Sequence, residues 1–325
     1  MKTLTARRIS WIFILSSAVI FWINGATAQE YPAKPINLLI CMQPGAGADL
    51  GGRLLAQEAT KTLGHEVVPV NKPGGGGAVA AGILAATRPD GYNLLSCTNG
   101  AFTTGPHLES IPYDPLKDLI PLGDFVSVPS VFAVRSDSPL KTLEELIEYA
   151  RQHPGKLKNA AGGLGTPSYF NLEILCAKNK VKITSIPFAS GGEALPALLG
   201  GHVDMSSNTI TTLGPSIKAG KLRALAITSK IRHPEYPDIP TTSELGSPEA
   251  NFLVWLGVFA PTGVSKTVLD ILIPSLENVF KNPEVVERAK KARFSVEYRG
   301  PEEFRKMIES EIEMIEKVAK STGLK

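Results

Sequence analysis

The sequence has few cysteines and lacks the short motifs by which many enzymes are recognised. It contains 3 cysteines in 325 residues, with no C-x-x-C pair and no Cys/His spacing typical of a zinc site. The nucleophile elbow G-x-S-x-G is absent, because Ser190 lies in the sequence Ala-Ser-Gly-Gly. These absences exclude the common hydrolase and zinc-site patterns. We therefore expect no catalytic residue, no metal and no cofactor.

Nucleotide-binding fingerprints are also missing. The dinucleotide motif G-x-G-x-x-G fails, because Gly45 and Gly47 are followed by Leu50 where the third glycine belongs. The second predicted strand, Glu66–Val70, is followed by Asn71, where that motif expects an acidic residue. No lysine follows the glycine run 74–77, so the phosphate-binding loop G-x-x-x-x-G-K-[ST] is absent as well. The sequence thus gives no support to a dehydrogenase or a nucleotidase.

The first 28 residues have the three-part pattern of a secretory signal. Basic residues at the start are followed by an apolar run over 9–23 and by the small residues Ala26, Thr27 and Ala28. The apolar run is short for a membrane span, although an uncleaved anchor is the alternative interpretation. No cysteine follows the run, so a lipoprotein anchor is not indicated. We expect cleavage after Ala28 and a periplasmic mature chain.

Removal of this segment makes the chain neutral. The full sequence has 34 Lys+Arg and 31 Asp+Glu, and three of the basic residues lie in the first 28. A neutral protein has no broad electrostatic attraction for phosphate backbones or anionic lipid. We therefore expect no nucleic-acid partner, and we expect a monomer.

The three cysteines remain in the mature chain, in an oxidising compartment. An odd number allows at most one disulfide. Cys41 and Cys97 each lie near the end of a predicted strand, so a disulfide between them is open, whereas burial of all three as small apolar residues, Cys176 included, is the simpler expectation.

The pattern of strands and helices predicts an α/β protein with two lobes. Apolar runs alternate with helical segments from about residue 34, as in βαβ units on a mainly parallel sheet flanked by helices. Irregular Pro-rich passages over 106–129 and 233–248 interrupt the pattern. We interpret them as crossings, with lobe 1 at 30–125 plus 250–325 and lobe 2 at 126–249, although a single domain remains open. The cleft between such lobes is where ligands are captured.

Two glycine-rich turns, one in each expected lobe, connect a predicted strand to a predicted helix. Backbone N–H groups at such a junction can bind a negative group without a basic side chain. Either turn alone could equally be only a tight connection. The candidate ligand-binding residues in them are Gln43, Pro44, Gly45, Ala46, Gly47, Ala48 and Asp49 in the first, and Gly163, Leu164, Gly165, Thr166, Pro167 and Ser168 in the second.

Several segments together resemble one family along almost the whole mature chain. They are the turn 44–49, Asn-Lys-Pro-Gly-Gly-Gly-Gly at 71–77, Arg-Pro-Asp-Gly-Tyr at 88–92, Ile-Pro-Tyr-Asp-Pro at 111–115, Gly-Leu-Gly-Thr at 163–166, Gly-Gly-His-Val-Asp at 200–204, Ala-Gly-Lys-Leu-Arg-Ala at 219–224, Ile-Pro-Thr-Thr at 239–242, and Trp255. In this order and spacing the chain resembles the substrate-binding proteins of tripartite tricarboxylate transporters, the Bug family.

The resemblance implies a periplasmic Venus flytrap of two α/β lobes that delivers a small carboxylate to membrane permease subunits. Di- and tricarboxylates and aromatic acids are the ligands it implies, and the carboxylate grip maps onto 44–49 and 163–168. Further candidate ligand-binding residues are Thr98, Asn99, Phe188, Ser190 and Asn208.

The chain departs from the family pattern near the second glycine turn. Tyr169 stands where the family often has histidine, and Pro-Phe-Ala-Ser-Gly at 187–191 replaces Pro-Tyr-Lys-Gly-Gly. Phe188 would make the cleft wall more apolar, although its placement in the core at a strand end is the simpler interpretation.

Two other functions stay open from the sequence. A sensory protein would present its loaded form to a membrane signalling partner instead of a permease. An exported α/β enzyme is the second alternative, and the missing motifs weaken it. In the C-terminal helix, the carboxylates at 309, 311, 313 and 316 are interpreted as a solvated face.

Overall fold

The computed structural model describes residues 31–108, 110–163 and 165–322. Its contacts divide the chain into Met1–Ala33 and a compact unit, Lys34–Lys325, and the fold given below is that of the compact unit. The expected signal segment and its cleavage after Ala28 lie outside the described residues. Within the described ranges, no helix combines the length and apolar character needed to cross a membrane.

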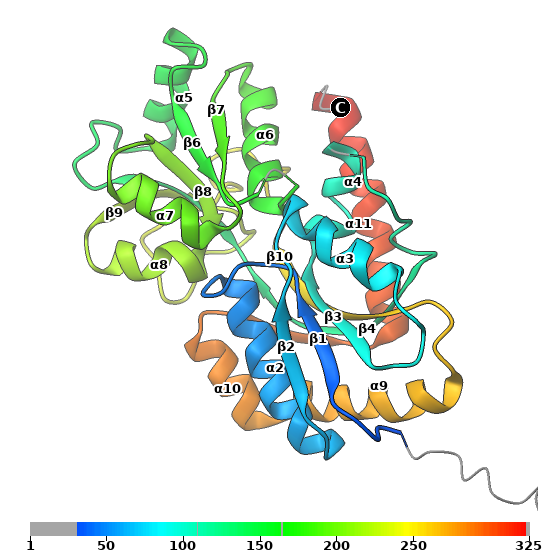
Figure 1. Cartoon of the computed structure of the whole chain (residues 1–325). Helices are drawn as coiled ribbons and strands as arrows, with labels where there is room; N and C mark the ends of the chain where they lie inside the picture. The colour runs from blue at the N-terminus through cyan, green and yellow to red at the C-terminus, as the bar shows by residue number, and fades with distance from the viewer. Residues whose placement is uncertain (1–30, 109, 164, 323–325) are drawn as a thin grey trace, which may run out of the picture. The chain divides into compact units, whose positions relative to one another are not determined.

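Two separate sheets form the framework of this unit (Figure 1). The first has six strands in the order β11-β4-β10-β3-β1-β2, namely β1 Ile36–Ile40, β2 Val67–Asn71, β3 Asn93–Thr98, β4 Leu119–Val128, β10 Val254–Pro261 and β11 Ser295–Arg299. The second has five strands in the order β7-β6-β8-β5-β9, namely β5 Ser130–Arg135, β6 Lys158–Ala161, β7 Thr184–Pro187, β8 Met205–Thr209 and β9 Leu222–Ile227.

Both sheets contain parallel and antiparallel pairs, and most strands of each sheet run in one direction, as predicted. β1 pairs in parallel with β2 and β3, whereas β10 is antiparallel to β3 and β4, and β11 is antiparallel to β4. In the second sheet β6 is parallel to β7 and β8, but β5 is antiparallel to β8 and β9. The reversed strands are β5 and β10, which the chain enters directly after the two crossings, and β11, which follows β10 through two helices and runs in the same direction as β10.

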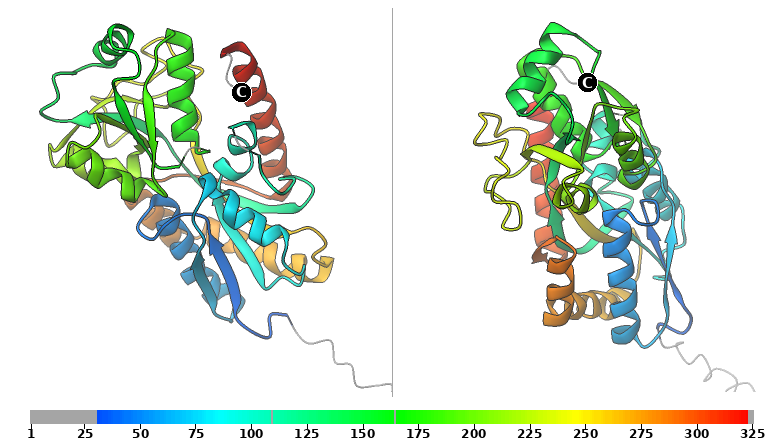
Figure 2. Two further views of the ribbon diagram at one scale, coloured as in Figure 1. Left: turned by 45° about the horizontal axis from the view of Figure 1, so that its top comes forward. Right: turned by 90° about the vertical axis from the view of Figure 1, so that its left-hand side faces the viewer.

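Helices cover both sheets, as the two views in Figure 2 show. Those attached to the first sheet are α2 Gly47–Leu63, α3 Ala78–Ala85, α4 Gly105–Leu108, α9 Lys266–Lys281, α10 Pro283–Lys291 and α11 Pro301–Thr322, with the short 3₁₀ turns η1 Gly75–Gly77 and η2 Asn99–Ala101. Those attached to the second are α5 Leu143–Gln152, α6 Pro167–Asn179, α7 Gly191–Leu199 and α8 Ile210–Lys218.

The chain passes between the sheets twice, which confirms the two-lobe plan. It leaves the first sheet at Val128 and enters the second at Ser130, with Pro129 between them, and it returns over 228–253. We call the parts around the six-stranded and the five-stranded sheet lobe 1 and lobe 2. Each lobe has its own buried apolar cluster, one around Phe102 and Phe259 and the other around Phe132 and Leu172.

The last helix, α11, joins the two lobes. It follows β11 in lobe 1 and lies beside α6 of lobe 2 in Figures 1 and 2. Ile315 of α11 packs in one buried cluster with Phe170 and Ile174 of α6 and with Phe252 of the return segment. Burial of these side chains makes α11 part of the connection between the lobes as well as part of the core of lobe 1.

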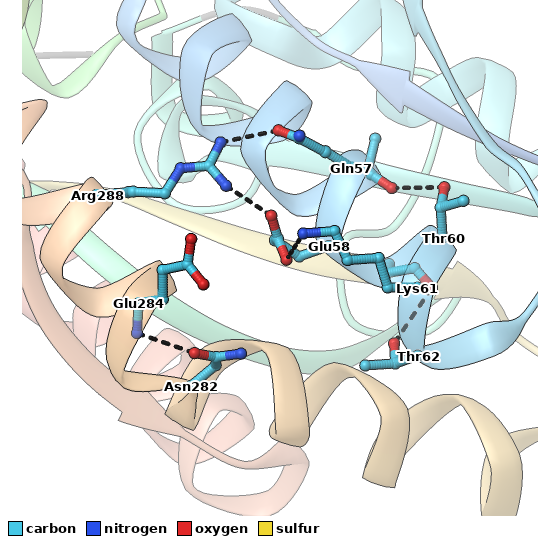
Figure 3. A network of polar contacts seen from close by, with 10 residues as sticks. Gln57, Glu58, Thr60, Lys61, Thr62, Asn282, Glu284 and Arg288 are labelled. Atoms are coloured by element: carbon cyan, nitrogen blue, oxygen red, sulfur yellow. Dashed lines mark hydrogen bonds and ion pairs between the residues drawn. The ribbon is translucent and has the colours of Figure 1, made fainter.

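A polar contact fixes α10 against α2 at the outer side of lobe 1 (Figure 3). Arg288 Nη1 lies 2.6 Å from Glu58 Oε1, and Arg288 Nη2 donates to Gln57 Oε1 at 2.8 Å. Lys61 Nζ donates to the other oxygen of Glu58 at 2.7 Å. The buried Glu58 carboxylate is therefore paired with two cations.

Candidate ligand cleft between the two lobes

A small cavity of about 50 Å³ lies between the two lobes. Its floor is formed by the crossing strands β4 and β10, and its sides by loops and helix starts of both lobes. The residues that line it are Met42, Ala46, Gly47, Ala48, Thr98, Val126, Val128, Gly162, Thr166, Ser168, Gly191, Asn208, Thr209, Thr211, Thr212, Val254, Trp255, Leu256 and Phe294.

Four helices begin at this cavity. Their N-cap residues are Ala46 for α2, Thr166 for α6, Ser190 for α7 and Thr209 for α8, and each cap or its immediate neighbours line the space. The first amides of a helix lack backbone partners and carry partial positive charge. Convergence of four such ends from both lobes makes the cavity favourable for an anion.

Two of these helix starts have no side-chain cap. The Ala46 side chain has no acceptor, and the Thr209 hydroxyl contacts the hydroxyls of Thr211 at 2.8 Å and Thr212 at 3.0 Å instead of accepting from a first-turn amide. By contrast, Thr166 and Ser190 accept hydrogen bonds from amides of their own helices. The first amides of α2 and α8 are thus without a side-chain cap on opposite sides of the cavity.

Asp49 stabilises the glycine-rich turn before α2 without lining the cavity. Its buried carboxylate accepts hydrogen bonds from Gly45 N at 2.9 Å, Arg53 Nε at 2.9 Å and Asn71 Nδ2 at 2.8 Å. Burial raises the pKa of Asp49, but these hydrogen bonds outweigh it and hold the pKa below its ordinary value. Gly45 has φ +84°, which favours glycine there. The conformation of the turn is therefore stabilised by the Asp49 carboxylate, which would not repel an anion in the cavity by lining it.

Two buried polar atoms at the cavity have no hydrogen-bond partner among the described residues. They are Thr98 Oγ1 in lobe 1 and Asn208 Nδ2 in lobe 2, in residues that are 4% and 6% exposed. The other end of the Asn208 amide accepts from Thr209 N at 2.8 Å, so the NH₂ group is the free end. Buried unsatisfied donors are costly, and a ligand with acceptor oxygens would satisfy them.

The rest of the lining is apolar and uncharged. Among the described residues that line the cavity, none is Asp, Glu, His, Lys or Arg. The apolar side chains are those of Met42, Val126, Val128, Val254, Trp255, Leu256 and Phe294. No group of three His, Cys, Asp or Glu residues in the described ranges is arranged to hold a metal ion. The site thus offers neutral donors, helix ends and an apolar floor.

Lobe 2 closes directly on the N-terminus of α2. A Cβ atom placed on Gly47 would lie 2.5 Å from Thr211 Oγ1, so these two segments are as close as a glycine allows. The second contact between the lobes is also made by glycines: a Cβ on Gly76 would lie 2.8 Å from the Gly165 carbonyl carbon, and Thr104 Oγ1 donates to Gly165 O at 2.6 Å. The two lobes are therefore in a closed arrangement.

The structure brings part of the predicted site together at this cavity. Of the residues predicted from the sequence, those that line it are Ala46, Gly47, Ala48, Thr98, Thr166, Ser168 and Asn208. Those that do not line it are Gln43, Pro44, Gly45, Asp49, Asn99, Gly163, Gly165, Pro167, Phe188 and Ser190, whereas Leu164 is outside the described residues. The ligand-binding role of each residue stays a prediction.

Other residues that line the cavity were not predicted from the sequence. The hydroxyls of Thr209, Thr211 and Thr212 lie at the end of β8 and in the first turn of α8. A strand-to-helix junction there could have been recognised by the same pattern as the glycine turns. Gly191 and the apolar floor, with Phe294, become neighbours of the site only through tertiary packing.

Fold and cavity together define a two-lobed solute-binding protein. The sequence profile of the tripartite tricarboxylate transporter family receptor matches residues 52–324. BugT of Bordetella pertussis is 32% identical over 301 residues, which are 92% of each chain, and a UPF0065 protein of the same species is 34% identical over 284 residues, 86% of this chain and 85% of that one. The chain belongs to this family of receptors, also called the Bug family, whose members are periplasmic solute-binding proteins.

Solved structures agree with this assignment. The periplasmic binding protein BugD has a TM-score of 0.85 at 32% identity, over 91% of this chain and 99% of that one. A Rhodopseudomonas palustris structure with adipate has a TM-score of 0.85 at 27% identity, and MatC from the same species, with bound malate, has 0.84 at 30%. They cover 90% and 89% of this chain and 99% of each of those chains.

Proposed function

We propose that this protein captures a small carboxylate in the periplasm and delivers it to the permease subunits of a tripartite tricarboxylate-type transporter. The observation that carries the proposal is the convergence of four helix N-termini on a cavity lined by Thr98 and Asn208, whose buried Oγ1 and Nδ2 atoms have no hydrogen-bond partner among the described residues. Such a site suits an anion with acceptor oxygens. Relatives in structures with adipate and malate support a di- or tricarboxylate, and the apolar floor is also compatible with an aromatic acid.

The ligand's carboxylate would lie in the cavity that the starts of α2 and α8 both line. There it would accept from the first amides of both helices and from Asn208 Nδ2, while Thr98 Oγ1 would meet an oxygen on the side of lobe 1. The carbon body would rest on Trp255 and the valines of β4. Neutral donors give this charge a site without an arginine clamp, because preorganised amides need not be rearranged on binding.

Ligand entry would require the lobes to separate. A cavity of about 50 Å³ has room for roughly four water molecules and is lined by both lobes. Rotation about the two crossings, near Pro129 and within 228–253, would open it. We keep the lobe boundaries 30–125 plus 250–325 and 126–249 as part of this proposal.

A ligand screen tests the proposed function. Mature protein, residues 29–325, is heated with mono-, di- and tricarboxylates and with the matched neutral amides, and hits are measured by calorimetry. A carboxylate at a hundred times its Kd should stabilise the fold by about 2.7 kcal/mol, whereas its amide should not. Stabilisation by sugars or cations but by no carboxylate would refute the proposal.

Further parts of the proposal have their own measurements. The mass of the exported product should correspond to a chain that begins at Gln29, and light scattering should give a monomer. The bound acid should be recovered unchanged, because we propose a binding protein and not an enzyme. The family match to a transporter receptor supports transport over sensing, so deletion of the gene should abolish uptake of the ligand.

A further inference from the structure

A carboxylate of the last helix lies behind the ligand cavity. Glu311 of α11 accepts hydrogen bonds from Asn99 Nδ2 at 2.8 Å and Thr103 Oγ1 at 2.7 Å on Oε1, and from Trp255 Nε1 at 2.8 Å on Oε2. The interpretation of residues 309–316 as one solvated face is therefore wrong for Glu311. The residue is half-buried and its carboxyl group is hydrogen-bonded to Asn99 of η2, to Thr103 and to Trp255 of β10, whereas Glu313 on the same helix is exposed.

Each partner of Glu311 is connected to the cavity. Trp255 lines it directly, on β10. Asn99 follows Thr98, which lines the cavity and has a buried hydroxyl without a hydrogen-bond partner among the described residues. Asn99 Nδ2 also donates to Leu253 O at 2.8 Å, beside β10. One carboxylate thus holds both the indole that forms the floor and the segment that carries a free polar group.

We propose that Glu311 is a positioning residue for ligand capture, which orients Trp255 and the Thr98–Asn99 segment toward the bound acid. The proposal rests on the proposed function, because it concerns the same cavity. Glu311 touches no part of the cavity itself, and its effect on the ligand passes through Trp255 and Asn99.

The cost of placing a carboxylate here argues against a merely structural role. No ion pair to Glu311 is found in the described part of the chain, and burial raises its pKa, against the hydrogen bonds from Thr103, Asn99 and Trp255. An apolar side chain at this position would avoid the desolvation. The two oxygens of the Glu311 carboxylate instead fix the orientation of three donors, namely Asn99 Nδ2, Thr103 Oγ1 and Trp255 Nε1.

Glu311 also faces a second, wider space. A groove of about 560 Å³ lies on the other side of Trp255 and is lined by Glu311 and by Met307 and Met314 of α11. Trp255 lines both spaces, and its ring packs on Phe304 with the ring centroids 5.0 Å apart and on Phe102 at 6.0 Å. These rings hold the body of the indole, and the hydrogen bond from Nε1 to Glu311 fixes the direction of its polar edge.

The chain contains its own reporter for this contact. Of the three tryptophans, Trp11 and Trp22 lie in the segment expected to be removed, so Trp255 is the single tryptophan of residues 29–325. Its emission reports the surroundings of the indole, including loss of the hydrogen bond from Nε1. Affinity and tryptophan emission can thus be measured in one titration.

The test compares Glu311→Gln with Glu313→Gln, an exposed residue on the same helix. Gln has one acceptor oxygen and one NH₂ group, so it cannot accept from both Trp255 and the Asn99–Thr103 pair. Each variant is titrated with the best carboxylate from the screen, and emission is recorded with and without ligand. Thr103→Val, which removes one donor at nearly constant shape, serves as the second variant, and circular dichroism checks the fold.

We expect Glu311→Gln to weaken binding roughly tenfold or more and to shift the emission of the ligand-free protein, since hydrogen bonds to charged groups are the stronger ones. Thr103→Val should weaken binding less, and Glu313→Gln should match the wild type. Wild-type affinity and emission in Glu311→Gln would overturn the proposal. If that variant does not fold, unchanged affinity in Thr103→Val would overturn it. A wild-type protein that binds no carboxylate would instead refute the proposed function.

Discussion

Gly47 of lobe 1 and Thr211 of lobe 2 are so close that a Cβ atom on Gly47 would lie 2.5 Å from Thr211 Oγ1. The Thr211 hydroxyl is held in place by Thr209 Oγ1 at 2.8 Å, so it cannot turn away without loss of that contact. Gly47 is the first residue of α2 and is not among the positive-φ glycines, which means that its backbone conformation suits other residues. The need for glycine here arises from closure of the lobes and not from the local backbone.

Substitution of Gly47 should therefore separate folding from binding. Gly47→Val is expected to abolish carboxylate binding, and Gly47→Ala to weaken it about tenfold, because overpacking costs 1–3 kcal/mol. Neither should lower the melting temperature of the ligand-free protein. Calorimetry and thermal melts measure both effects. Gly192→Ala, whose Cβ would meet only Ser190 Oγ at 3.6 Å, is the matched control.

A double-mutant cycle tests the cause of this effect. Thr211→Ala removes the oxygen that Gly47→Ala would meet, so the double variant should regain part of the affinity lost by Gly47→Ala. Additive losses in the two single variants would show that closure on Thr211 is not the reason for the glycine, and unchanged affinity in Gly47→Val would mean that the α2 turn is not part of the site.

Asn208 should discriminate charge in the ligand. Asn208→Leu removes the free Nδ2 donor and should weaken binding about tenfold, as for one buried hydrogen bond to a charged group. Asn208→Asp places a carboxylate where the ligand's carboxylate is expected, and like charges at an interface cost several kcal/mol, so about a hundredfold loss or more is expected. Equilibrium titration of both variants with the ligand measures whether the affinity of Asn208→Asp is the lower of the two. Tighter binding in Asn208→Asp than in Asn208→Leu would contradict an anionic ligand.

The parts of the fold that follow from local pattern were predictable, and those that depend on pairing were not. The turn before α2 could be recognised because glycines separate an apolar strand from a helical pattern. β4, in contrast, contains Pro121, Gly123 and Asp124, and its register shifts against β10, so no regular alternation marks it as a strand. It was predicted as an irregular passage for that reason.

The candidate site likewise combines features that follow from local sequence pattern with features that depend on tertiary packing. Each glycine turn is visible in the sequence, but the convergence of four helix starts depends on how the two lobes close. Glu311 illustrates the limit most clearly. The sequence places it in a run of charged residues, but its spacing from the apolar residues Phe304, Ile308 and Ile315 puts it on their buried face of α11, unlike Glu313. The hydrogen bonds that it accepts from Trp255 and Asn99 depend on tertiary packing and do not follow from that spacing.

The pair of Glu58 and Arg288 in Figure 3 should affect stability and leave binding unchanged. Arg288→Ala leaves Glu58 with Lys61 as its remaining cation, and the Arg288 side chain is 38% exposed. The expected loss is therefore about 1 kcal/mol, below that for a fully buried pair. Urea denaturation measures it, with Lys266→Ala, at an exposed pair, as a control without effect. A tenfold change in carboxylate affinity would contradict this separation.

The stabilising effect of Glu58 should depend on pH. The hydrogen bond from Lys61 lowers the pKa of Glu58, against the effect of burial, and Arg288 lowers it further. A carboxyl with a lowered pKa stabilises the fold above its ordinary value of 4.5, and this stabilisation is lost as the pH falls through the lowered pKa. The difference in unfolding free energy between wild type and Arg288→Ala should thus shrink at low pH. An equal difference at neutral and acidic pH would contradict it.

The three cysteines should be free thiols that react only after unfolding. Cys41 and Cys97 directly follow Ile40 and Ser96, which pair in the parallel strands β1 and β3, and all three thiols are free and buried. Burial raises the pKa of Cys97, and it raises the pKa of Cys176 to about 12, so little thiolate forms at these two residues near neutral pH. Burial also raises the pKa of Cys41, but hydrogen bonds with Cys97 and Thr98 outweigh it and lower this pKa, so Cys41 is protected by its complete burial. Titration with a thiol reagent should find almost none in the native protein and three in guanidinium. A single thiol in guanidinium, rising to three after reduction, would instead establish a disulfide between the neighbours Cys41 and Cys97.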